Sequence, residues 1–379
     1  MKIPFNKPYM TGKELHYIAD AHSRRHLSGD GFYTNECNNW MSKCAGSSSA
    51  LLTHSCTAAL EMSAILIEIE PGDEVIMPSY TFVSSANAFV LRGAVPVFVD
   101  IRPDTLNIDE SLIECAISDK TKAILPVHYA GVGCEMDKIL EVANKYNLIV
   151  IEDAAQGVQS TYKGRPLGGI GDLGTYSFHE TKNVISGEGG GLLVNNQIYS
   201  ERAEIIREKG TNRSQFLRGM ADKYTWVDIG SSFLPGEIIA AFLYAQMEEA
   251  EAITQRRLYV WDLYHNQLKG LEASGILRRP IIPDECQHNA HMYYILLNSK
   301  KARDSLIVYL KEKGIHSVFH YIPLHNSPAG KQYSKSIGEL IHTINASDTI
   351  LRLPIFSELK EEEVAYITSA IYDWNQSTR

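Results

Sequence analysis

Two side chains in the middle of the chain could do covalent chemistry together. Asp153 directly follows the run Leu-Ile-Val-Ile-Glu at 148–152, which is typical of a buried strand, and Lys182 lies in the polar segment 177–183. A lysine amine forms a Schiff base with a carbonyl cofactor, and a carboxylate keeps a pyridine nitrogen protonated so that the ring withdraws electrons. This pair, at a strand end and in a tight loop, predicts a pyridoxal phosphate site.

Hydroxyl-bearing residues near this pair could hold the phosphate. Ser177 lies in the same loop as Lys182 and could donate a hydrogen bond to it. The segment Ser-Cys-Thr-Ala-Ala at 55–59 is expected to begin a helix, whose first N–H groups and dipole favour an anion. Thr57 alone is more typical of a helix N-cap. Together with Ser177 it predicts a second wall of the phosphate site.

Each of these residues also has an ordinary structural interpretation. A strand-end aspartate often caps a turn, and most lysines are only solvated. Phe82, in Pro-Ser-Tyr-Thr-Phe at 78–82, could lie flat on a cofactor ring or pack in the core. The glycine-rich run at 187–191 lacks both the Gly-Lys-Ser/Thr of a Walker A loop and the spacing of a dinucleotide fingerprint. The joint order of Asp153 and Lys182 favours the functional interpretation, because the intervening strands would bring both to one face of a sheet.

Charges and histidines further along the chain indicate a substrate site. The cations of the segment 207–223 are Arg207, Lys209, Arg213, Arg218 and Lys223. In an acidic protein this segment is the candidate site for a diphosphate, with a solvated loop as the alternative. His320 and His325 have a proline between them and no carboxylate nearby, so we predict substrate contact or a structural role and no metal site.

The composition limits the class of protein. With 44% hydrophobic and 21% charged residues the chain is typical of a globular protein, and its net charge of −9 disfavours nucleic acid. No apolar run approaches the ~18–20 residues of a membrane span. Six scattered cysteines without a C-x-x-C pair indicate free thiols in a reducing compartment. We therefore expect a soluble cytoplasmic protein with no nucleic-acid or membrane partner.

The first part of the chain has the pattern of an α/β domain. Between 51 and 196, short apolar runs alternate with amphipathic helical stretches, which predicts a parallel sheet covered by helices on both faces. The runs expected to form strands are 74–77, 95–99, 123–127 and 148–151. Ligands of such sheets bind outside the carboxyl ends of the strands.

The pattern changes after about residue 254. There we expect a smaller α+β unit with strands at 292–297, 317–321 and 351–353 and helices at 302–313 and 361–374. Cores stop growing near ~250–300 residues, so the 379 residues are expected to form two domains. Their predicted extents are 1–253 and 254–379.

These motifs, in this order, resemble the DegT/DnrJ/StrS sugar-nucleotide aminotransferases, which are pyridoxal-phosphate enzymes of fold type I. The resemblance runs from Pro4 to Leu353 and is carried by the motifs at 27–31, 78–82, 152–156, 177–183, 187–190 and 320–325. The segments 179–183 and 208–216 are closest to one subgroup. It contains the WecE/RffA-type transaminases, which make dTDP-4-amino-4,6-dideoxygalactose for enterobacterial common antigen.

The resemblance implies a mostly parallel central sheet with helices on both faces, a smaller C-terminal α+β domain and a role for each matching residue. Lys182 would form the Schiff base, Asp153 would pair with the pyridine nitrogen and Phe82 would stack on the ring. Gln156 would contact the ring oxygen. The phosphate would be held by Thr57, Ala58 and Ser177. The residues expected to contact the sugar nucleotide are Lys209, Arg213, His320, Tyr321 and His325.

The resemblance also implies partners and one departure. L-glutamate would donate the amino group to a nucleotide-linked keto sugar, and the enzyme would be a homodimer with its active sites at the interface. Many relatives carry Gly-x-Asn-x-Arg-Met where this chain reads Gly-Ser-Ser-Phe-Leu-Pro at 230–235. Ser232 therefore occupies the position of the asparagine that reaches the partner's phosphate.

Several activities share this pattern of motifs. A C-3 aminotransferase, or one that forms the gluco epimer at C-4, would differ only in the geometry of the sugar pocket. The dehydratases of the family carry histidine in place of the Schiff-base lysine, so Lys182 disfavours them. A non-catalytic sensor on the same fold would need neither Lys182 nor Asp153.

Overall fold

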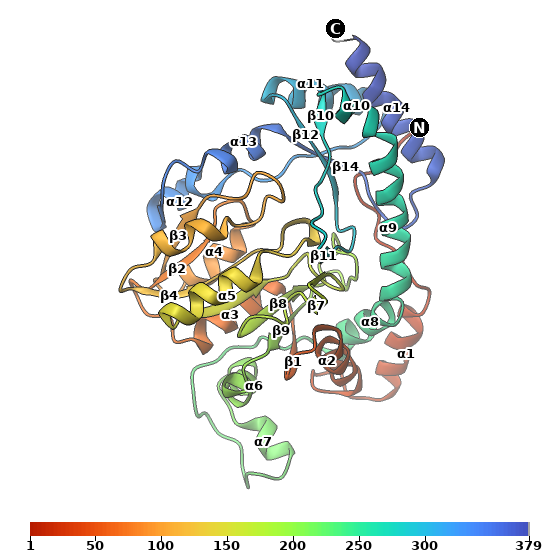
Figure 1. The fold of residues 1–379 in the computed structure, drawn as a ribbon. Helices are drawn as coiled ribbons and strands as arrows, with labels where there is room; N and C mark the ends of the chain where they lie inside the picture. The colour runs from red at the N-terminus through yellow and green to blue at the C-terminus, as the bar shows by residue number, and fades with distance from the viewer. Residues whose placement is uncertain (378–379) are drawn as a thin grey trace.

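The centre of the molecule is an eight-stranded sheet in the order β1-β9-β8-β5-β4-β2-β3-β13, seen in a computed structural model that describes residues 1–377 (Figure 1). Its strands are β1 (Ser49–Thr53), β2 (Glu74–Pro78), β3 (Val95–Val99), β4 (Thr121–Ile124), β5 (Ile149–Asp153), β8 (Leu173–Ser177), β9 (Gly190–Val194) and β13 (Lys335–Ser336). The neighbours from β8 through β5, β4, β2 and β3 to β13 are all parallel. Strand β9 is antiparallel to both β8 and β1. The predicted mostly parallel sheet is confirmed.

Helices cover both faces of this sheet, because its strands are apolar on both faces. The helices on one face are α2 (Phe32–Ala45), α5 (Met136–Tyr146) and α8 (Glu237–Glu248). Those on the other face are α3 (Cys56–Leu66), α4 (Val83–Val90) and α6 (Ser200–Arg207). Within β2, Ile76 belongs to the first core and Val75 and Met77 to the second, as the alternation of side chains along a strand requires.

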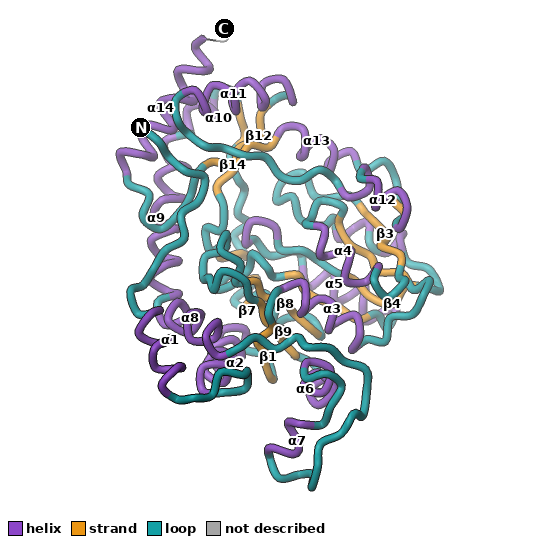
Figure 2. The backbone as a smooth tube through the Cα atoms, turned by 180° about the vertical axis from the view of Figure 1, so that it is seen from behind, coloured by secondary structure: helices purple, strands orange, loops and turns teal. Residues whose placement is uncertain are grey.

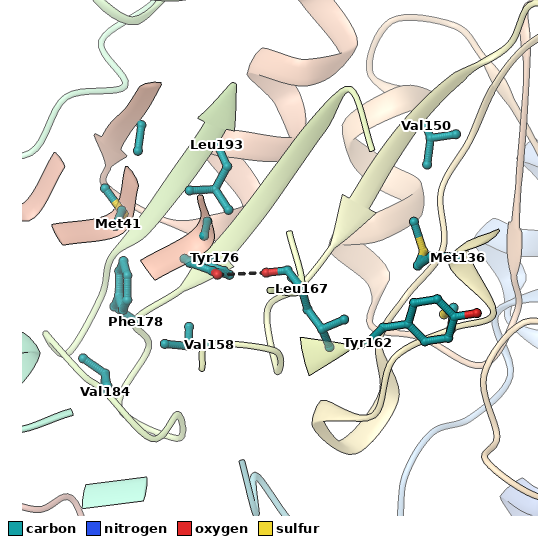
Figure 3. Packing of buried hydrophobic residues seen from close by; sticks show 14 of the residues in the cluster. Met41, Met136, Val150, Val158, Tyr162, Leu167, Tyr176, Phe178, Val184 and Leu193 are labelled. Carbon is teal, nitrogen blue, oxygen red and sulfur yellow. Dashed lines mark hydrogen bonds between the residues drawn. The ribbon is translucent and has the colours of Figure 1, made fainter. Parts of the chain in front are cut away.

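The first of these cores is densely packed beneath the carboxyl ends of the strands. Met41, Tyr176 and Leu193 are buried together there, and the hydroxyl of Tyr176 donates a hydrogen bond of 2.8 Å to the carbonyl of Leu167 (Figure 3). Gly191 allows this contact, since an added Cβ would lie 2.3 Å from the sulfur of Met41. The segment between β5 and β8 is thus attached to this core through Leu167.

A second, smaller sheet forms the predicted C-terminal unit. It consists of the antiparallel strands β10 (Leu277–Arg278), β12 (Tyr293–Leu297) and β14 (Ile350–Leu353). The helices packed around it are α9 (Ala250–Gln267), α11 (Lys300–Glu312) and α14 (Glu361–Ser377). The N-terminal arm joins the same core, because Ile3 is buried in it and pairs with Ile315, and both views place the N-terminus beside α14 (Figure 2). The predicted boundary between 253 and 254 falls inside α9 and stays a prediction.

One expected strand is absent from the part of the chain that the structure describes. The segment 317–321 contributes only an isolated bridge between Val318 and Arg352. The following carbonyl groups accept hydrogen bonds from side chains instead. The hydroxyl of Tyr80 donates to the carbonyl of His320 at 2.6 Å, and the hydroxyl of Ser347 donates to the carbonyl of Tyr321 at 2.7 Å. Side-chain donors therefore replace the strand partner at this point.

The remaining helices and strands of the described residues are short. The remaining helices are α1 (Glu14–Ser23), α7 (Arg213–Leu217), α10 (Lys269–Ala273), α12 (Pro328–Tyr333) and α13 (Ile341–Thr349). The strands β6 (Thr161–Tyr162), β7 (Arg165–Pro166) and β11 (Cys286–Gln287) form a third sheet. Three-residue 3-10 helices are η1 (Glu110–Leu112), η2 (Glu114–Ala116), η3 (Tyr129–Gly131), η4 (Gln197–Tyr199) and η5 (Leu324–Asn326). Helix α7 and the loop after it project away from the central sheet (Figures 1 and 2). A membrane-spanning helix is not found within residues 1–377.

Candidate active site

The strand register brings the predicted cofactor residues to one edge of the sheet. Thr53 at the end of β1 and Ser177 at the end of β8 both lie opposite Gly190 on β9. Asp153 ends β5 opposite Thr175 of β8. The carboxyl ends of β1, β8 and β5 therefore lie side by side, and the loops after them share one site.

Gly190 allows the start of α3 to approach this edge. A Cβ at Gly190 would lie 2.3 Å from the backbone nitrogen of Cys56 and 2.3 Å from the carbonyl carbon of Ser55. Real side chains do not tolerate such distances, so only glycine fits. The glycine run that matches no nucleotide-binding motif thus has a packing role at the site.

Asp153 is held in place by donors on both of its carboxylate oxygens. The hydroxyl of Ser85 donates to Oδ2 at 2.7 Å, and the backbone N–H of Ala155 donates to Oδ1 at 3.1 Å. Ser85 is itself 2.8 Å from the hydroxyl of Thr81. Asp153 is 6% exposed, so it presents a buried, oriented carboxylate at the strand end.

The residue before it, Glu152, is a fully buried structural carboxylate. Its oxygens accept hydrogen bonds from the backbone N–H groups of Gly168, Ile170 and Gly171 at 2.9, 2.6 and 2.7 Å. Oε2 also lies 2.9 Å from Nε2 of His128. Four groups from outside β5 thus converge on the residue that adjoins Asp153.

We expect Glu152→Ala to lower the free energy of unfolding by about 3–5 kcal/mol, because it leaves several buried donors without an acceptor. Urea and thermal unfolding measure this change. Glu114→Ala is the matched control, since Glu114 is a surface carboxylate paired with Lys145, and its removal should change the free energy of unfolding far less. Equal effects of the two variants would contradict the structural role of Glu152.

Lys182 presents an amine without a hydrogen-bond partner. Its backbone N–H donates to His179, but within residues 1–377 its Nζ makes no hydrogen bond or ion pair. Burial lowers the pKa of Lys182, the nearby Cys56 and Asp153 oppose this, and the positive charge of Arg352 adds to it. A lowered pKa increases the neutral fraction of the amine, which is the nucleophilic and basic form.

A small pocket at this amine is lined by three of the predicted residues, Gln156, Ser177 and Lys182. Its lining residues are Ala155, Gln156, Val158, Ser177, Lys182, Asn183, Val184, Asn289 and His291. Phe82 caps the N-terminus of α4 and is 58% exposed, whereas Tyr80 is buried in the core. Of the two interpretations of Phe82, core packing is therefore wrong. The desolvated amine, the oriented carboxylate and the exposed aromatic ring form a set that fits pyridoxal phosphate.

The expected phosphate residues lie at the β1 and β8 side of the pocket. Ser55 is the N-cap of α3, and its hydroxyl accepts the N–H of Ala58 at 3.0 Å. Thr57 is consequently not the cap, and its hydroxyl donates instead to Ser84 of α4 at 2.8 Å. Ser177 is buried at the end of β8. The structure thus brings Thr57, Ala58 and Ser177 to one side of the site.

Gln156 links the large sheet to the C-terminal unit. Its Oε1 accepts the N–H of Ala130 at 2.7 Å, and its Nε2 donates to the hydroxyl of Tyr321 at 3.3 Å. His325 is anchored to the end of β2, because its Nδ1 lies 2.7 Å from the hydroxyl of Ser79. Burial lowers the pKa of His325. Tyr321 and His325 are therefore both placed at the sheet edge.

His320 lies beside a residue that the sequence analysis missed. Its ring stacks on Tyr321 with centroids 4.0 Å apart, and the guanidinium of Arg352 donates a hydrogen bond to it. Burial, together with the charges of Arg352 and Lys182, lowers the pKa of His320 to about 2, so the ring is neutral. The available signal was a single cation inside the apolar strand Ile-Leu-Arg-Leu at 350–353.

The basic segment does not form a group of unpaired cations. Arg207 is buried and pairs with Asp30 at 2.5 Å, and Arg218 pairs with Glu204 at 2.7 Å. Lys209 and Arg213 both face Glu208, at 2.8 and 3.6 Å. Lys223 lies exposed in the loop after α7. Arg207 therefore has a structural partner, and the diphosphate role of Lys209 and Arg213 stays a prediction.

Ser232 lies next to this segment and is exposed. It forms an isolated antiparallel bridge with Glu208. The following residue, Phe233, accepts the backbone N–H of His54 at 2.9 Å, just before the start of α3. The backbone at Ser232 is thus close in space to the start of α3, where the expected phosphate residues Thr57 and Ala58 lie. Its role toward a partner's phosphate stays a prediction.

Comparison with known proteins agrees with this arrangement. The model of the DegT/DnrJ/EryC1/StrS aminotransferase family matches residues 8–372. The spore coat polysaccharide biosynthesis protein SpsC of Bacillus subtilis is 31% identical over 98% of this chain and 96% of its own length. The GDP-perosamine synthase of Caulobacter vibrioides is 31% identical over 98% of this chain and 97% of its own length.

A solved structure shows the same fold with the cofactor. The PLP form of Spr1654 from Streptococcus pneumoniae superposes with a TM-score of 0.91 and 27% identity over all of both chains. Its PMP form gives the same TM-score and covers 100% of this chain and 98% of the other. The chain belongs to the DegT/DnrJ/EryC1/StrS aminotransferase family and is a pyridoxal-phosphate-dependent enzyme.

Proposed function

We propose that the enzyme transfers an amino group from L-glutamate to C-4 of dTDP-4-keto-6-deoxy-D-glucose, giving dTDP-4-amino-4,6-dideoxy-D-galactose and 2-oxoglutarate. The observation that carries amino transfer is the amine of Lys182, which makes no hydrogen bond or ion pair within the described residues and interacts electrostatically with the oriented carboxylate of Asp153. The choice of C-4 and of the galacto product rests on the resemblance of the segments 179–183 and 208–216 to that subgroup. The product would serve surface polysaccharide synthesis, such as that of enterobacterial common antigen or an O-antigen.

The residues of the pocket divide the work of the reaction. Bound pyridoxal phosphate supplies an electron sink that stabilises negative charge at the carbon that carries the amine. Asp153 holds the proton on the pyridine nitrogen, and Ser85 and Ala155 keep its carboxylate oriented. Nζ of Lys182, whose pKa burial lowers, would remove the proton from the α-carbon of glutamate and later return a proton to C-4 of the sugar. Two half-reactions in one site give ping-pong kinetics.

The other predicted residues bind and orient in this proposal. Phe82 would cover one face of the ring, and Gln156, which is held by Ala130 and Tyr321, would contact the ring oxygen. The phosphate contacts are assigned to Thr57, Ala58, Ser177 and, across the interface, Ser232. The sugar-nucleotide contacts are assigned to Lys209, Arg213, His320, Tyr321 and His325.

A homodimer and a cytoplasmic location belong to the same proposal. The projecting segment after α7 exposes large apolar side chains, with Met220 at 71%, Trp226 at 80% and Val227 at 50%. Contiguous exposed apolar residues are typical of a surface that another chain covers. The six cysteines are all free thiols, which suits a reducing compartment.

The visible absorbance of the purified protein with pyridoxal phosphate tests amino transfer first. We expect a visible band that L-glutamate alone removes, because glutamate leaves its amino group on the enzyme. Addition of dTDP-4-keto-6-deoxyglucose should restore the band, and NMR of the product should show an axial amine at C-4. An amine at C-3 or an equatorial amine would identify the alternative aminotransferases. A band that glutamate leaves unchanged would contradict the proposed donor and reaction.

A GDP-linked keto sugar is the second candidate acceptor. Two relatives that cover 98% of this chain, at 31% and 32% identity, are GDP-perosamine synthases. Comparison of kcat/KM for the dTDP- and GDP-linked keto sugars decides between them. A higher value for the GDP-linked sugar would replace the dTDP assignment and keep the amino transfer.

A further inference from the structure

Arg352 carries a buried positive charge that no acidic side chain of the described residues balances. It lies in β14 and is 8% exposed. Its Nε is buried without a hydrogen-bond partner, and across residues 1–377 it forms no ion pair with any carboxylate. Burial lowers the pKa of Arg352, and the only groups that oppose this shift are tyrosine hydroxyls. An unpaired buried charge of this kind is costly unless an anion binds to it.

Other buried arginines of the same chain have partners that Arg352 lacks. Arg207 pairs with Asp30 at 2.5 Å, and Arg303 pairs with Asp304 at 2.6 Å. Arg257 donates hydrogen bonds to the carbonyl groups of three residues, at 3.1, 3.4 and 2.8 Å. The guanidinium of Arg352 instead contacts two neutral rings. It donates a hydrogen bond to the ring of His320, and its carbon lies 4.8 Å from the ring centroid of Phe5.

Arg352 is close enough to the amine of Lys182 for its charge to act on that amine. Its charge lowers the pKa values of Lys182 and of His291, which both line the pocket. Its neighbour His320 stacks on Tyr321, whose hydroxyl accepts a hydrogen bond from Gln156 of the same pocket. An anion that binds Arg352 would therefore lie beside the atoms that react.

The sheet order separates this charge from the expected phosphate residues. The tyrosines that interact with Arg352 follow β2 and β4, at Tyr80 and Tyr129. Thr57 and Ser177 follow β1 and β8, on the other side of β5. Asp153, at the end of β5, lies between the two groups. In the strand order, Arg352 is therefore associated with the β2 and β4 side of Asp153, and Ser177 with the β8 side.

We propose that Arg352, assisted by the neutral ring of His320, binds the α-carboxylate of the amino donor. This inference rests on the proposed function, because only an amino-acid donor brings a carboxylate on the same carbon as its amine. That carboxylate would lie next to the carbon from which Lys182 removes the proton. Arginine suits this role because its planar fork of N–H groups matches a carboxylate.

The test compares the two half-reactions of the native holoenzyme with those of Arg352→Gln. The variant should raise the glutamate concentration that half-saturates loss of the visible band by about 10- to 100-fold, as expected for charge-assisted hydrogen bonds. The return half-reaction with the keto sugar should keep its half-saturating concentration. For Arg352→Lys, the half-saturating glutamate concentration should lie between those of the native enzyme and of Arg352→Gln. Arg303→Gln removes another buried arginine of the same unit and should keep the native half-saturating concentration. Loss of affinity for the sugar alone would overturn the proposal.

Binding measurements identify which carboxylate is held and keep the proposal testable if the native enzyme does not react. Calorimetry on the holoenzyme should show that Arg352→Gln and Arg352→Lys weaken both 2-oxoglutarate and 2-oxobutyrate. A loss confined to 2-oxoglutarate would place the distal carboxylate at Arg352 and overturn the α-carboxylate assignment. If glutamate fails to remove the native band, the proposed donor reaction is wrong. Unchanged binding of both oxo acids by the variants would overturn the role of Arg352 itself.

Discussion

Lys182→Ala is expected to lower kcat for amino transfer by about 10⁴-fold or more while the protein remains folded, since the variant has no base at the α-carbon. The side chain contributes no hydrogen bond or ion pair within the described residues, so its removal breaks no structural contact. Burial already lowers the pKa of Lys182, which means that the charged form is disfavoured at this position. Stability should therefore be equal to or slightly above that of the native enzyme.

Three measurements on this variant separate chemistry from folding. Steady-state formation of 2-oxoglutarate reports turnover, the visible spectrum reports the lysine–cofactor linkage, and thermal unfolding reports the fold. Lys145→Ala is the matched control, because Lys145 is a surface lysine that pairs with Glu114 and contacts the ring of Tyr146. Substantial turnover by Lys182→Ala would refute the assignment of the catalytic amine.

Asp153→Asn is expected to lower the rate of both half-reactions by about 10²–10³-fold, because it removes the charge that keeps the pyridine nitrogen protonated. The substitution is nearly isosteric. The N–H of Ala155 still finds an amide oxygen, and Ser85 can accept from the new amide while it donates to Thr81. The loss is therefore electrostatic, and the unfolding midpoint should change little.

Rapid-mixing spectroscopy on each half-reaction measures this effect directly. Both steps should slow together, which distinguishes Asp153 from a residue that serves only the donor, such as Arg352 in our proposal. Asp137→Asn is the control, since this surface aspartate pairs with Lys163 and Arg165 away from the pocket. Near-native rates for both half-reactions in Asp153→Asn would show that the carboxylate does not act on the ring.

Local patterns in the sequence predicted many of the elements and the candidate pair Asp153 and Lys182. The apolar runs before residues 78 and 153 predicted β2 and β5, because strands covered on both faces must be apolar on both faces. In such a sheet a polar residue at a strand end lies at the ligand edge, so Asp153 was identifiable without coordinates. Ser177 and Lys182 were predicted from one polar segment, which the structure places at the end of β8 and in the loop after it.

Contacts between distant segments were decided by the tertiary structure. Arg352 lies 170 residues after Lys182 in the sequence. Nothing in the pattern of residues 350–353 shows that the rings of Phe5 and His320 contact its guanidinium. Arg207 looked like a free cation until the fold placed Asp30 beside it. Likewise, the segment 317–321 has a strand pattern, yet the hydroxyls of Tyr80 and Ser347 donate hydrogen bonds to its carbonyl groups.

The division has a physical cause. Strand and helix patterns, and the chemistry of a residue at a strand end, depend on neighbours within a few positions, and the sequence states these directly. Pairing of a buried charge depends on which distant group shares its low-dielectric surroundings, and that choice is made only when the chain packs. The sequence by itself therefore predicted β2, β5 and the candidate pair of Asp153 and Lys182. Only the tertiary structure decided that Arg207 has a carboxylate partner and that Arg352 has none within residues 1–377.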